Sequence, residues 1–421
     1  MGSVQIQAQD FTVPRPKRIM DLSGKKILIC EEALIDQKGH FQTWIRAIRQ
    51  MHLDAGAQVF VAGNEAVVDD VRSDLAVLPI YTVNSWDQKK LGSLPAWRRH
   101  FRVFAQNWRI FWQTRKALRA AGPVDALFFT AVRVHHLIGL RLLCMWGLGH
   151  RFKKLTCFLL TSQAEYNADF TSFQFPRRSG LIALVLKSFK RLVERGSVIL
   201  AGDSHITCAE YEKLTNIPMT LFPSPGSDLR YVKTAPTKGA TVFTLLGVST
   251  WDKGIDNFQS SILKFLERNP ESQATFVLQW SVPCQRPDGS IVEVSEKLRS
   301  DHRVTYLERR LSNEEYATYF RDADFIVLPY RKMTYFNRIS GVAVEAAVSG
   351  KPMIVTESTW LEWAVNEFGS GIAVPEGGIE ELCAAIERCC EERDSILARA
   401  RERMAVARDY NSSERYLSLL W

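Results

Sequence analysis

Several features that would assign this chain to other protein classes are missing from its 421 residues. No run of about 18 uncharged apolar residues occurs, so the sequence predicts no membrane-spanning helix. The first 21 residues have no continuous apolar core, which argues against a secretory signal. The eight cysteines show no zinc-type spacing, and we interpret them as reduced thiols of a cytosolic protein. No Asp-x-Asp metal motif stands out, so no metal site is predicted.

What the sequence does contain is an alternation of strand and helix patterns in both halves. The length favours two domains, and the turn formers of 223–227 give the clearest linker signal between them. Residues 204–208 and 219–222 are predicted as the last strands before that linker. The net charge of +8 and the pI near 9 suit an anionic partner, such as a nucleotide, an anionic lipid surface or nucleic acid.

The most informative stretch runs from residue 322 to 360 and reads as strand, loop, helix and strand. Phe325–Leu328 is a short apolar run, as expected for a strand buried on both faces. A loop carrying basic residues follows, and a helix opens at Ser340 and Gly341. Gly350 ends this helix before the next buried strand at Met353–Val355. Ligands of parallel sheets bind beyond the carboxyl ends of the strands, where this loop lies.

The residue types in this loop and helix suit a nucleoside diphosphate sugar. A helix start presents unpaired N–H groups and a partial positive charge, which favour a phosphate or sugar hydroxyls. Glu345 lies one turn after Gly341, where its carboxylate can accept two hydrogen bonds from a ribose. Two arginines add donors for a diphosphate. The predicted nucleotide site comprises Arg331, Arg338, Ser340, Gly341, Val342 and Glu345.

The segment 345–355 resembles the signature of the retaining, nucleotide-sugar-dependent glycosyltransferases of family 4. Glu345-Ala346-Ala347 and the Gly-x-Pro-hydrophobic sequence of 350–355 carry the resemblance, while Asn337 stands where the family has a first Glu. The resemblance implies an α/β fold of GT-B architecture, with two Rossmann-like domains and a cleft between them. It implies an arm over 1–24, an acceptor domain over 25–224, a donor domain over 225–404, and a final helix over 405–421 that crosses back to the first domain.

The same resemblance extends to the start of the second domain. Gly247, Lys253 and Gly254 match the family's Gly-Arg…Lys-Gly segment, with Val248 in place of the arginine. By this resemblance Lys253, Arg331 and Arg338 are candidate catalytic residues, which balance the leaving diphosphate without a metal. Gly247, Asn337 and Gly39 are further donor-binding candidates. His40, His135 and His136 are candidates for the acceptor site, although the last two could equally be ordinary helix residues.

Two basic segments, 95–122 and 177–195, remain open to two interpretations. In 95–122 the residues Phe101, Phe104, Trp108, Phe111 and Trp112 recur at helical spacing among arginines. The helix could rest on anionic lipid, or its aromatic stripe could pack on the core with a solvated basic face. In 177–195, Leu181, Leu184, Val185, Phe189 and Leu192 are expected on one side. No recognised nucleic-acid module accompanies either segment, so no nucleic-acid partner is predicted.

The sequence therefore predicts a hexosyltransferase that moves a sugar from a UDP- or GDP-linked donor to a hydroxyl of a glycan, lipid-linked or small-molecule acceptor. We expect retention of configuration, no cofactor besides the donor substrate, and no metal. A nucleotide-sugar epimerase of related fold and a non-catalytic sugar-nucleotide-binding scaffold are the alternatives. The expected location is cytoplasmic, with a peripheral position at the inner face of a membrane left open.

Overall fold

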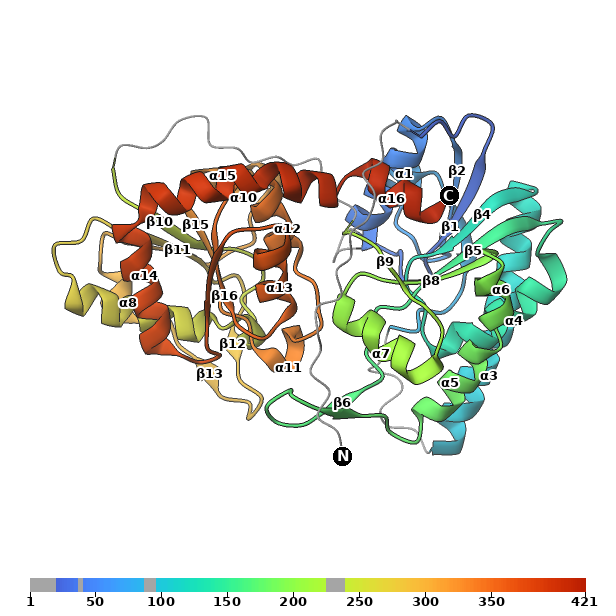
Figure 1. The fold of residues 1–421 in the computed structure, drawn as a ribbon, viewed down its shortest axis with the longest axis horizontal. Helices are drawn as coiled ribbons and strands as arrows, with labels where there is room; N and C mark the ends of the chain where they lie inside the picture. The colour runs from blue at the N-terminus through green and yellow to red at the C-terminus, as the bar shows by residue number, and fades with distance from the viewer. Residues whose placement is uncertain (1–19, 37–40, 87–95, 225–238) are drawn as a thin grey trace. The chain divides into compact units, whose positions relative to one another are not determined.

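The computed structural model describes residues 20–36, 41–86, 96–224 and 239–421, and only the backbone of 96–100. It divides into two compact units (Figure 1). The N-terminal unit comprises Met1–Pro225 together with Ser413–Trp421, and the C-terminal unit comprises Gly226–Ser412. The chain returns to the N-terminal unit at Ser413, which is later than the predicted position 405. The reason is that helix α15 (Arg393–Tyr410) continues past residue 405 within the C-terminal unit.

The N-terminal unit is built on a parallel seven-stranded sheet of order β3-β2-β1-β4-β5-β8-β9. Its central strand β1 is buried on both faces, since Leu28 and Cys30 belong to one core cluster and Ile27 and Ile29 to another. This explains why the strand is continuously apolar. The strands are β1 (Lys26–Cys30), β2 (Gln58–Asn64), β3 (Val77–Tyr81), β4 (Val124–Phe129), β5 (Phe152–Phe158), β8 (Val198–Gly202) and β9 (Thr220–Leu221).

Helices cover both faces of this sheet (Figure 1). One face packs against α3 (Ala96–Ala121), α4 (Val134–Gly147), α5 (Ser179–Lys187) and α6 (Lys190–Glu194). The other packs against α1 (Phe41–Asp54), α2 (Asp69–Leu75) and α16 (Ser413–Leu420). Helix α7 (His205–Thr215) and the hairpin of β6 (Glu165–Tyr166) and β7 (Phe173–Gln174) complete the unit.

Helix α7 corrects the prediction of a strand over 204–208. Ser204 is extended and precedes the helix, and the strand is β8, which ends at Gly202. A short apolar run fits a strand and a helix equally well, so periodicity alone could not separate them.

The C-terminal unit has a parallel six-stranded sheet of order β14-β11-β10-β15-β16-β17. The strands are β10 (Val242–Leu245), β11 (Thr275–Gln279), β14 (Val304–Leu307), β15 (Phe325–Leu328), β16 (Met353–Thr356) and β17 (Gly371–Val374). The helices are α8 (Ile255–Arg268), α9 (Glu296–Arg299), α10 (Asn313–Asp322), α11 (Lys332–Tyr335), α12 (Gly341–Val348), α13 (Trp360–Glu367), α14 (Ile379–Glu391) and α15. A 3-10 turn, η2 (Trp251–Lys253), and a hairpin of β12 (Cys284–Gln285) and β13 (Ile291–Val292) lie between them.

Within the described ranges, no helix combines the length and apolar character needed to cross a bilayer. All eight cysteines are free thiols, and seven of them are buried.

Candidate functional site

The candidate nucleotide site lies where the C-terminal sheet changes direction. From β10 the chain adds β11 and β14 on one side, and then β15, β16 and β17 on the other. The loops after β10 and β15 are therefore neighbours at the carboxyl edge, which is where open parallel sheets bind ligands. A hydrogen bond of 2.8 Å from the Arg331 amide to the Asp252 carbonyl joins the two loops.

Two glycines permit the close approach of these loops. Gly254 has φ of 65°, and a Cβ there would lie 2.0 Å from the Pro329 carbonyl oxygen, so a side chain cannot fit. Gly247 has φ of 108°, and a Cβ there would lie 2.7 Å from the Lys253 Nζ. The Lys253 side chain consequently folds back over the turn that follows β10.

Arg331 holds the loops together rather than facing a ligand. Its Nη2 lies 2.6 Å from Asp256 Oδ2, its Nε donates to the Trp251 carbonyl at 3.1 Å, and its guanidinium stacks 3.9 Å from the Trp251 ring centroid. The side chains of this ion pair are only 12% and 14% exposed. Because Asp256 already neutralises this charge, we revise the predicted role of Arg331 from diphosphate donor to loop positioning.

Two other predicted cations are not neutralised in this way. Within the described residues, neither Lys253 nor Arg338 forms an ion pair. Burial is the main cause that lowers the pKa of Lys253. The charge of Arg338 also lowers this pKa, and the charge of Asp252 raises it without reversing the net decrease. Arg338 is exposed and lies 5.6 Å from the Tyr335 ring centroid. Lys253 and Arg338 repel each other at the edge of the sheet, and a bound anion would offset this repulsion.

The start of α12 adds amide donors. Ser340 caps the helix, since its Oγ accepts from the Ala343 amide at 3.4 Å and its carbonyl accepts from the Val344 amide at 3.1 Å. The structure gives the amides of Gly341 and Val342 no acceptor among the residues it describes. Gly341 is exposed, and among the described residues outside its own helical turn no atom lies within 4 Å of a Cβ built there, so the helix start is open. It can therefore receive an anion at its positive end.

The two remaining predicted donor residues lie on either side of this helix start. Glu345 is half-buried one turn into α12, and the Tyr316 hydroxyl donates to its Oε2 at 2.7 Å. This bond fixes the direction of the carboxylate. Asn337 is half-buried in the segment between α11 and α12.

A spacing that resembles a metal motif lies away from this edge. Asp322-Ala323-Asp324 precedes β15 and so belongs to the amino edge of the sheet. Asp324 is buried, accepts from the Val242 amide at 3.1 Å and pairs with Arg393 at 3.1 Å. Its carboxylate is therefore part of the scaffold.

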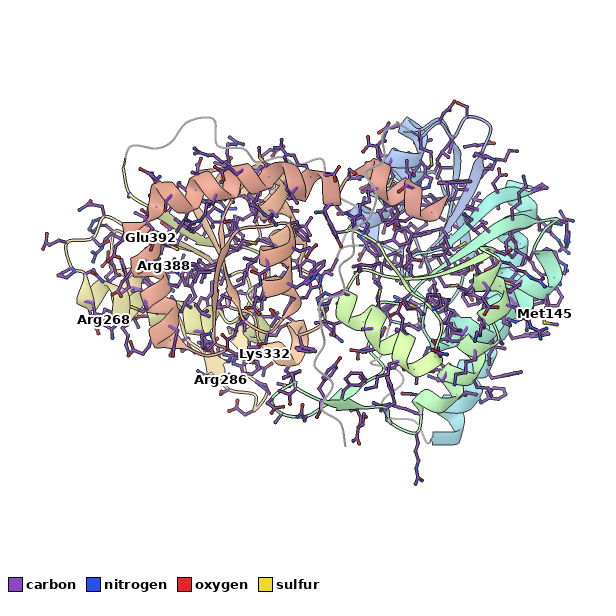
Figure 2. The ribbon with its side chains drawn as sticks, in the orientation of Figure 1. Met145, Arg268, Arg286, Lys332, Arg388 and Glu392 are labelled. Carbon is purple, nitrogen blue, oxygen red and sulfur yellow. The ribbon has the colours of Figure 1, made fainter. Side chains whose placement is uncertain are left out.

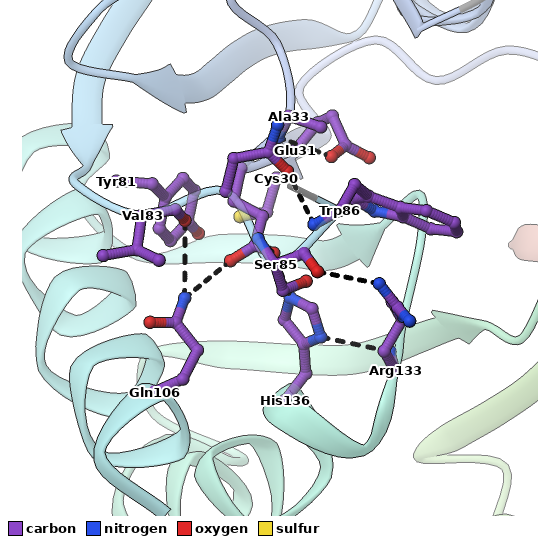
Figure 3. Close-up of polar contacts among 12 residues, drawn as sticks. Cys30, Glu31, Ala33, Tyr81, Val83, Ser85, Trp86, Gln106, Arg133 and His136 are labelled. Atoms are coloured by element: carbon purple, nitrogen blue, oxygen red, sulfur yellow. Dashed lines mark hydrogen bonds and ion pairs between the residues drawn. The ribbon is translucent and has the colours of Figure 1, made fainter. Parts of the chain in front are cut away.

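The N-terminal sheet has a corresponding change of direction between β1 and β4, and buried polar groups occupy it (Figure 3). Glu31 follows β1 directly and is 2% exposed. It accepts from the Ala33 amide at 2.8 Å, and its other oxygen is bonded to the Thr130 hydroxyl, which follows β4. Burial raises the pKa of Glu31 to about 7.

Glu32 is the charged partner in this cluster. It accepts from the Ser85 amide at 2.7 Å and from Gln106 Nε2 at 2.8 Å, and its Oε1 lies 3.4 Å from His136 Nε2. Burial alone would raise the pKa of Glu32, but His136 and the hydrogen bonds outweigh burial and lower the pKa to about 2.

His136 is 1% exposed and cannot contact an acceptor, so its predicted acceptor-site role is wrong. Burial lowers its pKa, and the charge of Glu32 outweighs this to give a net increase. The Arg133 amide donates to His136 Nδ1 at 3.1 Å. That bond fits an unprotonated Nδ1, so we assign the tautomer that carries its proton on Nε2 and donates it to Glu32.

Of the other predicted acceptor residues, only His135 is described. It is half-buried, and burial, with Arg133 and His136, lowers its pKa to about 4, so it is neutral at pH 7. Gly39 and His40 lie outside the described residues. Sequence reasoning missed Glu31, Glu32 and Gln106. Two adjacent carboxylates directly after a buried strand were the available signal.

The aromatic segment 95–122 does not pack as a stripe on the core. Phe111 is buried, but Phe101, Phe104, Trp108 and Trp112 are 67%, 60%, 49% and 45% exposed. In 177–195 the predicted apolar side is also divided, because Leu181 and Leu184 are exposed while Phe189 is buried. The core-packing interpretation of the four aromatics is therefore wrong.

Comparison with known proteins agrees with this geometry. The family described as Glycosyl transferases group 1 matches residues 240–392, which include every predicted donor residue except Gly39. D-inositol 3-phosphate glycosyltransferase of Corynebacterium kroppenstedtii is 24% identical over 208 residues, and the match covers 46% of this chain and 44% of that relative. The chain thus spans less than half the length of this curated relative.

Solved structures extend the likeness to nearly the whole fold. A glycosyltransferase from Rickettsia africae superposes with a TM-score of 0.63 at 12% identity, covering 94% of this chain and 95% of that one. Anabaena Alr3699/HepE, solved in complex with UDP and glucose, superposes with a TM-score of 0.55 at 14% identity, covering 94% and 97%. At such identities the likeness establishes the fold, which is GT-B with two Rossmann-like domains.

Proposed function

We propose, for a chain that has the GT-B fold and carries a glycosyl transferases group 1 domain, that it transfers a sugar from a nucleoside diphosphate to an acceptor hydroxyl. The observation that carries this proposal is the set of donors at the carboxyl edge of the C-terminal sheet. Neither Lys253 nor Arg338 forms an ion pair among the described residues, and the amides of Gly341 and Val342 lack acceptors there. Cations and a helix start together suit a diphosphate.

In this proposal each residue has a separate task. Lys253 and Arg338 neutralise the charge that develops on the diphosphate as the sugar leaves, and the Gly341 and Val342 amides hold its oxygens. Glu345, oriented by Tyr316, accepts from the ribose hydroxyls. Because two cations already oppose the leaving group's charge, we propose that the reaction needs no metal. Activity that survives excess EDTA supports this part, and activity restored only by a divalent ion contradicts it.

The donor's nucleobase and the stereochemical outcome are also proposals. UDP is the first candidate, because HepE was solved with UDP and glucose. Retention of configuration is proposed from the resemblance of 345–355 to retaining enzymes. Proton NMR of the first product formed from an α-linked donor tests it, since an α-linked product supports retention and a β-linked product refutes it.

Calorimetric titration with uridine, UMP, UDP and GDP tests the site directly. Lys253→Ala and Arg338→Ala each remove a charge-assisted contact worth about 1.5–3 kcal/mol, so UDP affinity should fall roughly 10- to 100-fold. Uridine affinity should not change. Lys297→Ala, at a lysine paired with Glu267 and 67% exposed, is the control. Equal losses for uridine and UDP would show that the cations do not contact the diphosphate.

Glu345→Ala tests the ribose contact. It should weaken UDP and uridine binding alike and leave pyrophosphate binding unchanged.

Measurements of turnover separate sugar transfer from the two alternative functions. Epimerisation of a nucleotide sugar without an acceptor would favour an epimerase. Tight binding of several nucleotide sugars with neither hydrolysis nor transfer would favour a non-catalytic scaffold.

A further inference from the structure

The outer side of α3 is an unusually apolar surface for a helix on the outside of a domain. Phe101, Phe104, Trp108 and Trp112 recur at intervals of three and four residues and lie on one face of the helix. They are 67%, 60%, 49% and 45% exposed. Most proteins expose large apolar side chains singly and far apart, whereas these four lie together on one helix. Trp108 and Trp112 also contact each other, with ring centroids 5.9 Å apart.

The fold does not need this aromatic face for its own core. The buried side of α3 is formed by other residues, and contacts the sheet and α4. These inward residues are Ile110, Phe111, Ala117, Leu118 and Ala121. The helix therefore has two apolar faces, and only one of them is buried among the residues of the unit that the structure describes.

The exposed apolar surface continues onto the neighbouring helices. Arg115 stacks between two tryptophans, 4.4 Å from the Trp112 ring on α3 and 4.4 Å from the Trp146 ring on α4. Beside Trp146, Met145 is 71% exposed and projects outward at the edge of the unit (Figure 2). On α5, which contacts α4, Leu181 and Leu184 are 55% and 68% exposed. We call these seven exposed side chains the α3–α5 surface: Phe101, Phe104, Trp108, Trp112, Met145, Leu181 and Leu184.

The charged side chains of the three helices that carry the α3–α5 surface have one sign. Helices α3, α4 and α5 contain no Asp or Glu. The arginines and lysines on α3 include Arg109, Lys116 and Arg119, which are all exposed, and Lys187 is exposed at the end of α5. Aromatic side chains next to exposed basic side chains are the composition of a helix that lies in the interface of an anionic bilayer.

We propose that the α3–α5 surface docks the N-terminal unit onto an anionic lipid bilayer. The tryptophans and phenylalanines enter the boundary between headgroups and acyl chains, and the arginines and lysines contact lipid phosphates. A second copy of the chain fits less well, because a symmetric contact would bring two carboxylate-free surfaces together. The proposal concerns binding alone and does not depend on the proposed sugar transfer.

Vesicle flotation of the full chain, without nucleotide, tests this proposal. Vesicles of phosphatidylcholine with about 30% phosphatidylglycerol should bind the chain at least tenfold more than phosphatidylcholine vesicles, and 0.5 M salt should remove most of the difference. Trp108→Ser/Trp112→Ser should lower binding at least tenfold. The control is Met333→Ser/Ile291→Ser, which removes two exposed apolar side chains from the C-terminal unit. Its binding should equal that of the unmodified chain.

A second pair of measurements separates insertion from simple attraction. Arg109→Gln/Lys116→Gln/Arg119→Gln keeps every aromatic residue and should lose the preference for anionic vesicles. Brominated acyl chains should quench the tryptophan fluorescence of the unmodified chain, which reports contact with the hydrocarbon. The proposal is overturned if the chain does not bind anionic vesicles or if it binds them without quenching. It is also overturned if the unmodified chain is a dimer that does not bind vesicles and the serine variant is a monomer.

Discussion

Glu31 offers a sharp test of the buried cluster in the N-terminal unit, because the structure predicts that replacing it will stabilise the protein. Its carboxyl group is fully enclosed between the Ala33 amide and the Thr130 hydroxyl, and Glu32 lies beside it in the chain. The pKa of Glu31 rises from 4.5 to about 7 on folding. The folded state therefore favours the protonated acid, and ionising it at neutral pH costs stability.

The magnitude follows from this difference. A change from 4.5 to about 7, at about 1.4 kcal/mol per pH unit, amounts to about 3 kcal/mol. The favourable contribution is fully present below pH 4.5 and is lost as the pH rises through about 7. Glu31→Gln removes the titration while keeping the contacts, since its amide oxygen can accept from Ala33 and its amide nitrogen can donate to Thr130 Oγ1. Thr130 can then donate to the Cys30 carbonyl, 3.3 Å away.

Hydrogen exchange of the slowest amides in β1 and β4 provides the assay, because it reports on the N-terminal unit alone. After correction for intrinsic rates, Glu31→Gln should increase protection about a hundredfold at pH 8 and hardly change it at pH 4.5. Glu65→Gln, at an exposed carboxylate, should behave like the unmodified protein at both pH values. Equal or reduced protection of Glu31→Gln at pH 8 would refute the reasoning, since it would mean that Glu31 is not held as a neutral acid.

Three further predictions follow from the two sites. Glu32→Gln should destabilise the N-terminal unit by about 3 kcal/mol at pH 7, because folding lowers the pKa of Glu32 from 4.5 to about 2. This stabilising contribution is present above pH 4.5 and is lost as the pH falls toward 2, so hydrogen exchange of the β1 amides at pH 7 and pH 3 measures it. Gly254→Ala should cost at least about 2 kcal/mol in urea unfolding and weaken UDP binding, whereas Gly377→Ala, with φ of 72° and open space, should cost about 1 kcal/mol and leave UDP affinity unchanged. Arg331→Ala should cost about 2 kcal/mol because it leaves Asp256 unpaired, and Arg331→Ala/Asp256→Ala should recover part of that loss in a double-mutant cycle.

The central stretch of the C-terminal unit was predictable because its signals are local. The apolar run of β15, the cap at Ser340 and the stop at Gly350 each depend on a few adjacent residues. Gly350 has φ of 65°, which is the conformation expected of a glycine that ends a helix. Local patterns of this kind determine the elements before any tertiary contact is known.

The errors have the opposite origin, in contacts between residues far apart in the sequence. Arg331 pairs with Asp256 across 75 positions, and no local pattern shows that this arginine is already neutralised. The aromatic face of α3 was misjudged because Ile110, Ala117 and Leu118 supply a second apolar face. Helical spacing identifies residues that share a face, but it does not decide which of two apolar faces packs inward.

Both sheets change direction at their centre, between β1 and β4 and between β10 and β15, but the groups at these two edges have opposite charge. In the N-terminal unit the edge between β1 and β4 is closed by Glu31 and Glu32, whose hydrogen bonds, including the contact with His136, end within the protein. In the C-terminal unit the edge between β10 and β15 has two cations and two helix amides without such partners among the described residues. A dianionic group approaching the first edge would meet buried carboxylates, whereas at the second it would meet donors that are already oriented. For this reason we propose that the nucleotide binds to the C-terminal unit, and we expect an uncharged hydroxyl, rather than a second phosphate, at the N-terminal edge.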